Sequence, residues 1–286
     1  MYRLIRAELF KLRKRPMTRI LLLVLAGIMV LFYLLLFAIS RVDLPAGPGG
    51  QHMGNLGDLL GLPVALPFGM SLMTTFGSVL AVILTASAMG SEYNWRTIRT
   101  AVVSSESRSK LLAAKLIAVG IYILGGMILG LAAGVIMSLI TTAIGGYKFD
   151  FGFATGGYLW NQFLQFWRTF YVLLPYVLFG FMFSIVGRSA MPGIALGIGV
   201  FFLESIVTTF MTLAGGWIAR IPDYLPTANV RAINALADLP SGFSTGMGGG
   251  FVELPGIAHA TITLAVYNVL FIAVAFHFFH RRDVTG

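Results

Sequence analysis

Residues 20–39, ILLLVLAGIMVLFYLLLFAI, form an uninterrupted apolar stretch without a charge. A helix rises 1.5 Å per residue, so this length matches the ~30 Å hydrocarbon layer of a bilayer. The stretch is too long for the core of a cleavable signal peptide, and no clean small-residue cleavage site follows it, so we interpret it as a first membrane span. Five further apolar blocks predict spans at residues 64–90, 111–140, 163–186, 190–215 and 257–279. The sequence predicts an all-α integral membrane protein with six transmembrane helices.

Composition supports this class. Hydrophobic residues make up 57% of the 286 positions and charged residues 11%, against roughly 25% charged residues in an ordinary soluble domain. The chain has no cysteine, which excludes disulfides, thiolate nucleophiles and zinc sites with cysteine ligands.

The distribution of charge predicts the topology. The net charge is +9, and fifteen of the twenty Lys and Arg residues fall in segments that a cytoplasmic N-terminus would place inside, at residues 1–19, 91–115, 187–189 and 280–286. Such a bias in short loops follows the positive-inside rule and predicts that both termini are cytoplasmic. Because the basic residues flank spans, no soluble basic face remains for nucleic acid.

The first 19 residues are basic and carry apolar residues at helical spacing, at Tyr2, Ile5, Leu9 and Leu12. This pattern predicts an amphipathic elbow helix that lies in the membrane interface. In the alternative interpretation, the basic residues only orient the protein. On the outer side, residues 216–256 form a long loop, within which Val230, Ile233 and Leu236 line one face of a short predicted helix. That helix would either cap the external mouth or lie on the outer surface.

The cytoplasmic segment after the second span is the most informative. Trp95, Ile98 and Val102 follow i, i+3, i+7 spacing, with Arg96 and Arg99 beside them. A short helix here would expose an apolar face on a basic loop, and such a face favours a protein partner. Trp95 could instead be a residue of the aromatic belt at the headgroup level. Ser107 or Ser105 is a suitable N-cap for the third span.

Two motifs resemble a known family. Arg6-x-Glu8-Leu9-x-Lys11-Leu12 precedes the first span, and residues 92–97 with Arg99 precede Ser107-Arg108 and Lys115. Together they resemble type-2 ATP-binding-cassette (ABC) permeases, particularly those of bacitracin- and lantibiotic-type exporters. The resemblance covers nearly the whole chain.

The resemblance implies that two six-span permeases pair around a substrate path and that residues 91–110 dock into a groove on an ABC ATPase subunit. The implied coupling residues are Glu92, Trp95, Arg96, Thr97, Ile98, Arg99, Val102 and Arg108. No G-x-x-x-x-G-K-[ST] phosphate loop occurs in the sequence. We therefore expect no enzyme activity and no directly bound cofactor, with ATP and Mg²⁺ used by the partner subunit.

Other candidate residues lie inside the spans. Glu204 is a carboxylate well within the fifth span, where burial of a charge costs at least ~2.5 kcal/mol. It either lines the transport path or hydrogen-bonds a neighbouring helix. Small residues at four-residue spacing favour close helix packing. The glycines with this spacing are Gly126, Gly130 and Gly134 in the third span and Gly193 and Gly197 in the fifth. The stripe of the third span could also serve the seam of a permease dimer.

Two further patterns carry little functional weight. His277 and His280 have ligand-like spacing but no third ligand nearby in sequence, so headgroup contact is the better interpretation than a metal site. Residues 242–246 match G-x-S-x-G, but in a glycine-rich loop without the strand and helix that a nucleophile elbow needs.

The expected function is thus the permease subunit of an ATP-driven exporter in the plasma membrane of a prokaryote, in contact with membrane lipids. An ion-coupled secondary transporter and a membrane-embedded enzyme remain alternatives. The sequence does not fix the substrate; peptide antibiotics, lipids and other amphipathic molecules all suit a path among apolar helices.

Overall fold

The computed structural model describes residues 1–41, 60–95, 107–145, 152–237 and 254–281, and in these ranges it contains helices and no strand. Six helices are long and apolar enough to cross a membrane, which confirms the six predicted spans and indicates a multi-pass membrane protein. They are α2 (Pro16–Ser40), the continuous run Leu62–Asn94, α6 (Arg108–Gly145), α7 (Gly156–Val186), α8 (Ala190–Ala214) and α10 (Ile257–Arg281).

Several helices extend beyond the predicted spans. The third predicted span covered residues 111–140, whereas α6 runs for 38 residues. The fourth was predicted to begin at residue 163, whereas α7 begins at Gly156, and the Thr155 hydroxyl accepts a hydrogen bond from the Tyr158 amide at its N-terminus. Apolar blocks locate the part of a helix suited to lipid, but backbone hydrogen bonding continues into polar flanks, so hydropathy underestimates helix length.

The second span contains a π-helical turn, which the sequence analysis did not predict. It consists of α3 (Leu62–Leu72), a five-residue π-helical turn, η2 (Met73–Gly77), and α4 (Ser78–Asn94). Pro67 lies inside α3 and has no amide hydrogen to donate. A π-helical turn inserts extra backbone into a helix and is often found at functional sites.

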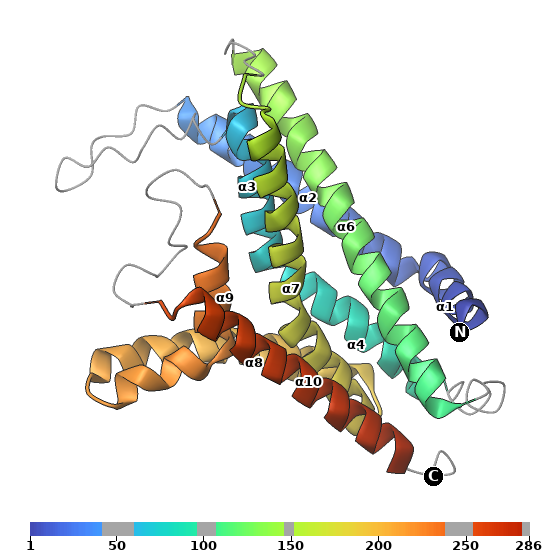
Figure 1. Ribbon diagram of the computed structural model, residues 1–286. Coiled ribbons are helices and arrows are strands. Elements are labelled where there is room, and N and C mark those ends of the chain that lie inside the picture. The colour runs from blue at the N-terminus through green and yellow to red at the C-terminus, as the bar shows by residue number, and fades with distance from the viewer. Residues whose placement is uncertain (42–59, 96–106, 146–151, 238–253, 282–286) are drawn as a thin grey trace.

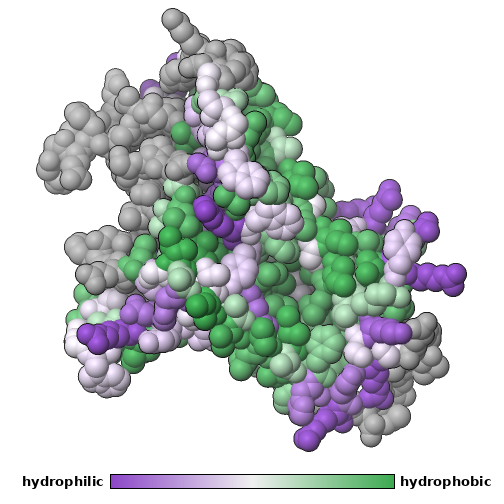
Figure 2. Space-filling view, in the orientation of Figure 1, coloured by the Kyte–Doolittle hydropathy of each residue, from purple (hydrophilic) through white to green (hydrophobic). Residues whose placement is uncertain are grey.

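The N-terminal residues form a separate helix, α1 (Tyr2–Lys14), which ends at Arg15 in an extended conformation; Pro16 then starts α2. The expected apolar stripe packs only in part, because Leu12 is buried whereas Tyr2 is exposed. Glu8 is buried although it is charged. In Figure 1, α1 lies beside the lower half of α6, and Figure 2 shows hydrophilic side chains projecting from this region next to the apolar body of the molecule.

The helices at the other end of the chain form a second group. After α8, a 3-10 segment, η3 (Ile218–Tyr224), leads into α9 (Pro226–Asn234). α9 is the short helix that was predicted within residues 216–256. Val230 and Ile233 of α9 are buried in one cluster with Tyr176 of α7 and Leu264 of α10. Figure 1 shows α8 and α10 diverging from α6, so that α7 and α4 connect the two halves.

Candidate functional site

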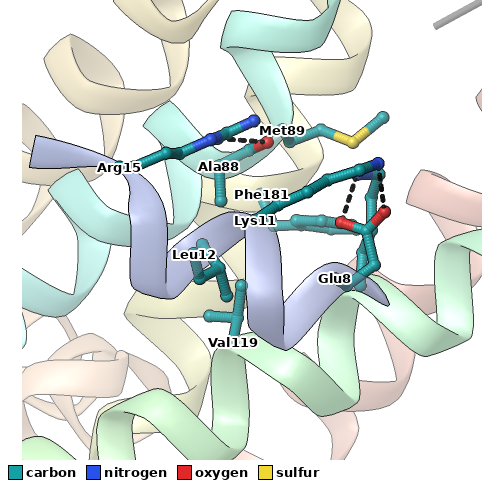
Figure 3. A pocket seen from close by; sticks show the side chains of 9 residues that line it. Glu8, Lys11, Leu12, Arg15, Ala88, Met89, Val119 and Phe181 are labelled. Carbon is teal, nitrogen blue, oxygen red and sulfur yellow. Dashed lines mark hydrogen bonds and ion pairs between the residues drawn. The ribbon is translucent and has the colours of Figure 1, made fainter. Parts of the chain in front are cut away.

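Four charged side chains from three helices meet where α4 ends. Glu8 and Lys11 come from α1, Glu92 from the last turn of α4 and Lys115 from the second turn of α6. We call these four residues the charge cluster. Figure 3 shows Glu8 and Lys11 at the edge of a narrow pocket that Leu12, Val119 and Phe181 line on its apolar side.

Lys115 is the centre of the cluster. Its ammonium group donates a hydrogen bond to Oε2 of Glu8 at 2.8 Å and a second, shorter one to Oε1 of Glu92. Lys11 lies at the rim, with Nζ 2.7 Å from Oε1 of Glu8 and 3.3 Å from Oε1 of Glu92. The two cations and two carboxylates alternate, so each charge faces opposite charges.

The cluster is buried on its inner side and open on its outer side. The side chains of Lys115 and Glu92 are 4% and 2% exposed, whereas that of Lys11 is 43% exposed. Burial opposes ionisation of Glu8, but Lys115 and Lys11 outweigh it and hold the pKa of that carboxyl below 4.5. Burial likewise opposes the charge of Lys11, and the carboxylates of Glu8 and Glu92 outweigh this and raise its pKa above 10.5. Both groups are therefore charged at neutral pH.

Arg15 extends the polar contacts along α4. Its guanidinium group donates hydrogen bonds to the backbone carbonyl oxygens of Ser87 and Ala88 at 3.4 and 3.2 Å. It also lies 5.5 Å from the ring centre of Trp95, within cation–π range. A cation near the C-terminus of a helix interacts favourably with the helix dipole. α1 and the turn after it are thus attached to the last two turns of α4 by both side-chain and backbone contacts.

The predicted coupling residues divide into three sets. Glu92 points inward into the charge cluster, and Trp95 is 66% exposed at the end of α4. Arg108 donates a hydrogen bond to the backbone carbonyl of His280 in α10 at 3.2 Å. The remaining predicted residues lie outside the described ranges; they are Arg96, Thr97, Ile98, Arg99 and Val102. Ser107 is the N-cap of α6, since its hydroxyl accepts a hydrogen bond from the Lys110 amide.

Sequence reasoning did not identify Glu8 and Lys115 as site residues. Both residues belong to the motifs that resemble ABC permeases, but the sequence analysis gave them no role of their own. The available signal was that Glu8 is the one acidic residue among seven basic residues in the first 19, while Lys115 lies four residues inside an apolar span. A single acidic residue in a basic segment and a lysine inside an apolar span are each stabilised by an opposite charge, so the two residues were candidates for an ion pair.

Glu204 lies elsewhere, at the contact between α8 and α9. It is 7% exposed, and Oε1 accepts a short hydrogen bond from the backbone amide of Thr227 in the first turn of α9. Arg231 of α9 donates to the hydroxyl of Ser205 beside it at 3.2 Å. The carboxylate therefore caps the N-terminus of α9 from a neighbouring helix, which matches the hydrogen-bonding alternative for this residue. A role in the transport path stays a prediction.

The glycine stripes lie at contacts within the chain. A Cβ at Gly126 or Gly130 would meet the side chains of Leu22, Leu25 or Met73, and one at Gly134 would meet Tyr33. The α6 stripe therefore faces α2 and η2. On α8, a Cβ at Gly193 would meet the Ser184 hydroxyl and the Gly180 carbonyl, and one at Gly197 would meet Val82.

His277 and His280 lie in the last two turns of α10. His277 packs edge-on against Phe278. The described ranges contain no group of three or more His, Cys, Asp or Glu side chains placed to hold a metal ion.

Comparison with known proteins gives a family without an assigned activity. The chain is 24% identical over 223 residues to the uncharacterized protein YhcI of Bacillus subtilis (strain 168), an alignment that covers 74% of this chain and 66% of YhcI. The chain therefore spans just under two thirds of the length of that relative. Residues 63–285 match the family described as "Protein of unknown function (DUF2705)". Because that match covers more than half of the chain, the protein belongs to the DUF2705 family.

Proposed function

We propose that this protein is the permease subunit of an ATP-driven exporter, and that residues 91–110 dock onto a separate ABC ATPase subunit. The observation that carries the proposal is the position of the charge cluster. Glu92 lies four residues before residues 96–106, and Lys115 lies nine residues after them, in the second turn of α6. A force on that segment would reach Glu92 through the end of α4 and Lys115 through the start of α6, and the contact of Lys115 with Glu8 would pass it on to α1.

The physical argument concerns rigidity. Buried ion pairs contribute little net stability compared with apolar packing, because desolvation offsets the attraction between the charges. Removing one partner, however, leaves an uncompensated buried charge, so the cluster resists separation of its three helices. A segment attached at both ends to such a cluster would pass force to α1, α4 and α6 together. This is the mechanical requirement for coupling ATP hydrolysis in a soluble subunit to membrane helices.

The proposal also assigns partners and topology. Two copies of this permease, or one copy and a similar permease, would assemble with two ATPase subunits that use ATP and Mg²⁺. The charge bias would place α1, residues 91–110 and the C-terminus in the cytoplasm of a prokaryote, at its plasma membrane. In support, α1, the start of α6 and the end of α10 share one side of the molecule, since Glu8 contacts Lys115 and Arg108 contacts His280. α1 would then lie along the cytoplasmic interface as an elbow helix.

The decisive experiment is cysteine cross-linking. Because the sequence contains no cysteine, each introduced cysteine is the only thiol in the chain. Single cysteines introduced as Arg99→Cys and Val102→Cys should cross-link to a co-expressed ABC ATPase subunit with a short bifunctional thiol reagent. Cysteines at Gly27→Cys and Gly199→Cys, which lie in open space on α2 and α8, are matched controls and should not cross-link. Cross-linking of the controls alone, or of none in active membranes, would contradict the docking.

Topology has its own test. Reporter fusions or thiol-accessibility probes at positions 48, 104, 150, 235 and 286 should read outside, inside, outside, outside and inside. An external signal at position 104 would contradict both the topology and the docking segment.

A second candidate function is supported by the π-helical turn in the second span. Irregular helices and buried ionisable residues within the spans are typical of ion-coupled secondary carriers. Here η2 is an irregular turn in the second span, and Glu204 is a buried carboxylate of α8. Collapse of the proton and sodium gradients at constant ATP separates the two functions. Transport that persists supports the ATP-driven exporter, and transport that stops supports the carrier.

A further inference from the structure

The first half of α7 carries a polar stripe on the face that packs inside the molecule. Gln162, Gln165 and Thr169 follow i, i+3, i+7 spacing, so they lie on one side of the helix. They are buried, with exposed fractions of 6%, 5% and 0%. No described residue exchanges a hydrogen bond with Oε1 of either glutamine or with Oγ1 of Thr169. We call these three residues the α7 stripe.

The opposite face of the same half-helix is aromatic. Trp160, Phe163 and Trp167 are exposed, and their rings contact one another along the helix. A surface helix of a soluble protein has these faces the other way round, with the apolar face inside. In a membrane, the aromatic face suits lipid, and polar side chains of a span face the bundle interior or a water-filled space.

The α7 stripe faces the second span. Figure 1 shows α3 and α7 side by side, and both α3 and η2 contact α7. One turn before Gln162, the Tyr158 hydroxyl donates a hydrogen bond to the backbone carbonyl of Pro63 in α3 at 2.7 Å. Further along α7, a Cβ at Gly180 would lie 3.0 Å from the side chain of Val82 in α4. The stripe lies between these two contacts and on the same side of α7, so it faces α3 and η2.

The facing stretch of the second span also departs from regular α-helical bonding. Pro67 has no amide hydrogen to donate to the Pro63 carbonyl, and the Tyr158 hydroxyl bonds that carbonyl instead. In the π-helical turn, the Thr74 hydroxyl donates a hydrogen bond to the Met70 carbonyl at 3.1 Å. Both sides of this contact therefore carry polar atoms, although both helices are long and apolar enough to span a membrane.

We propose that the contact between the α7 stripe and the second span is a hydrated site, in which water molecules supply the hydrogen bonds of Gln162, Gln165 and Thr169. Buried polar groups in proteins are hydrogen-bonded to protein or to ordered water, and a buried water needs two to four polar partners. Successive stripe residues are about 5–6 Å apart on the helix surface, a gap that one water bridges with two hydrogen bonds of ~2.8 Å. The stripe carries no charge, so it favours water over an ion. Thr169 lies thirteen residues into α7, so the water would extend about 20 Å along the helix.

Cysteine reactivity tests the hydration, because the chain has no thiol of its own and the reactive thiolate forms only in contact with water. Gln165→Cys and Thr169→Cys are made singly and treated with a cationic methanethiosulfonate in open membrane fragments, where both membrane faces meet the reagent. Trp167→Cys is the lipid-facing control at the same depth, since Trp167 is 45% exposed, and Leu173→Cys is the buried apolar control. Both stripe cysteines should react about tenfold faster than either control, or more. If Trp167→Cys reacts fastest, or if the stripe cysteines are as slow as Leu173→Cys, the contact is dry and the proposal is overturned.

A second substitution tests the site without relying on one cysteine variant. Gln165→Leu keeps a similar size but removes the amide, so in the Thr169→Cys chain it should slow the reaction about fivefold or more. Phe163→Leu on the lipid-facing side is the matched control and should leave the rate unchanged. Gln162→Cys takes the place of Thr169→Cys if that variant does not fold. A rate that Gln165→Leu leaves unchanged would also overturn the proposal. None of these results bears on ATPase docking.

Discussion

The ammonium group of Lys115 lies 2.8 Å from the carboxylate of Glu8, although the two residues are 107 positions apart in the chain. The contact joins α1, which precedes the first span, to the third span. Because Lys115 also binds Glu92, the same cation ties the end of the second span to both. Three helices at one side of the molecule are therefore held by a single buried side chain, and its removal gives the sharpest test of the cluster.

Lys115→Met should destabilise the protein by about 3–5 kcal/mol, because it leaves two buried carboxylates with one rim cation between them. Lys11→Met is the matched control. The Lys11 side chain is 43% exposed, so its loss should cost about 1 kcal/mol or less. Thermal unfolding in detergent, followed by loss of monodisperse protein, measures both. Equal losses for the two variants would contradict a central role for Lys115.

The cluster also predicts a dependence of stability on pH. The pKa of Glu8 is below its ordinary value of 4.5, so its stabilising contribution is complete above pH 4.5 and is lost as the pH falls through the lowered pKa. Glu8→Gln should therefore melt below the parental protein at pH 7, and the difference should shrink in acid. At the alkaline end, the raised pKa of Lys11 means that its contribution is complete below pH 10.5 and is lost as the pH rises through the raised value. A difference between parent and Glu8→Gln that grows in acid would contradict the assignment.

The spans could be predicted from the sequence because the hydropathy of a continuous segment is enough to favour its insertion into a bilayer as a helix. Residues 20–39 identify α2 whatever they pack against, since lipid alone favours a helix there. The charge cluster could not be predicted in this way, because the pairing of Glu8 with Lys115 depends on how three helices pack. The π-helical turn at Met73–Gly77 was not predicted either, although its sequence, MTTFG, is more polar than the segments on both sides of it. Contacts between helices are set by side-chain shape, which a single sequence does not reveal.

Glu204 should stabilise α9 through its hydrogen bond to the Thr227 amide. Glu204→Gln keeps an acceptor oxygen and should remain within about 0.5 kcal/mol of the parental stability, whereas Glu204→Leu should lose about 0.5–2 kcal/mol, as for other lost N-caps. Limited proteolysis between α8 and α10, followed with time, measures the opening of α9. If Glu204→Gln keeps parental membrane levels and proteolysis but exports less, the carboxylate has the separate transport role that the sequence predicts.

Gly90 should tolerate no side chain. A Cβ there would lie 2.0 Å from the backbone nitrogen of Ala190 and 2.2 Å from its Cα, so α4 and the start of α8 would have to separate. Gly90→Ala should therefore cost about 1–3 kcal/mol or more. Gly199→Ala is the control, since its Cβ meets nothing within 4 Å and alanine in a helix should instead stabilise by roughly 0.5–1 kcal/mol. Opposite shifts in melting temperature are the expected result. A Gly90→Ala protein as stable as the parent would show that this contact is looser than described.

The last prediction concerns Trp95, which is the last described residue before residues 96–106. Its side chain is 66% exposed, and its one ring contact with a described cation is the guanidinium group of Arg15 at 5.5 Å. A large exposed aromatic residue beside basic residues is typical of an interface anchor, and truncation of such anchors commonly costs more than ~2 kcal/mol of binding. Trp95→Ala should therefore weaken association with the ATPase subunit about thirtyfold or more.

One control and one further variant separate docking from the aromatic-belt alternative. Arg15→Gln removes the cation beside the ring but leaves the ring itself, so it should retain most of the association. Arg96→Glu with Arg99→Glu should weaken assembly more strongly at low salt, where the reversed charges are less screened. Co-purification and substrate-stimulated ATP hydrolysis are measured for all variants at equal membrane levels. If Trp95→Ala inserts normally and keeps both at the parental level, Trp95 is a residue of the headgroup region and the docking surface lies elsewhere.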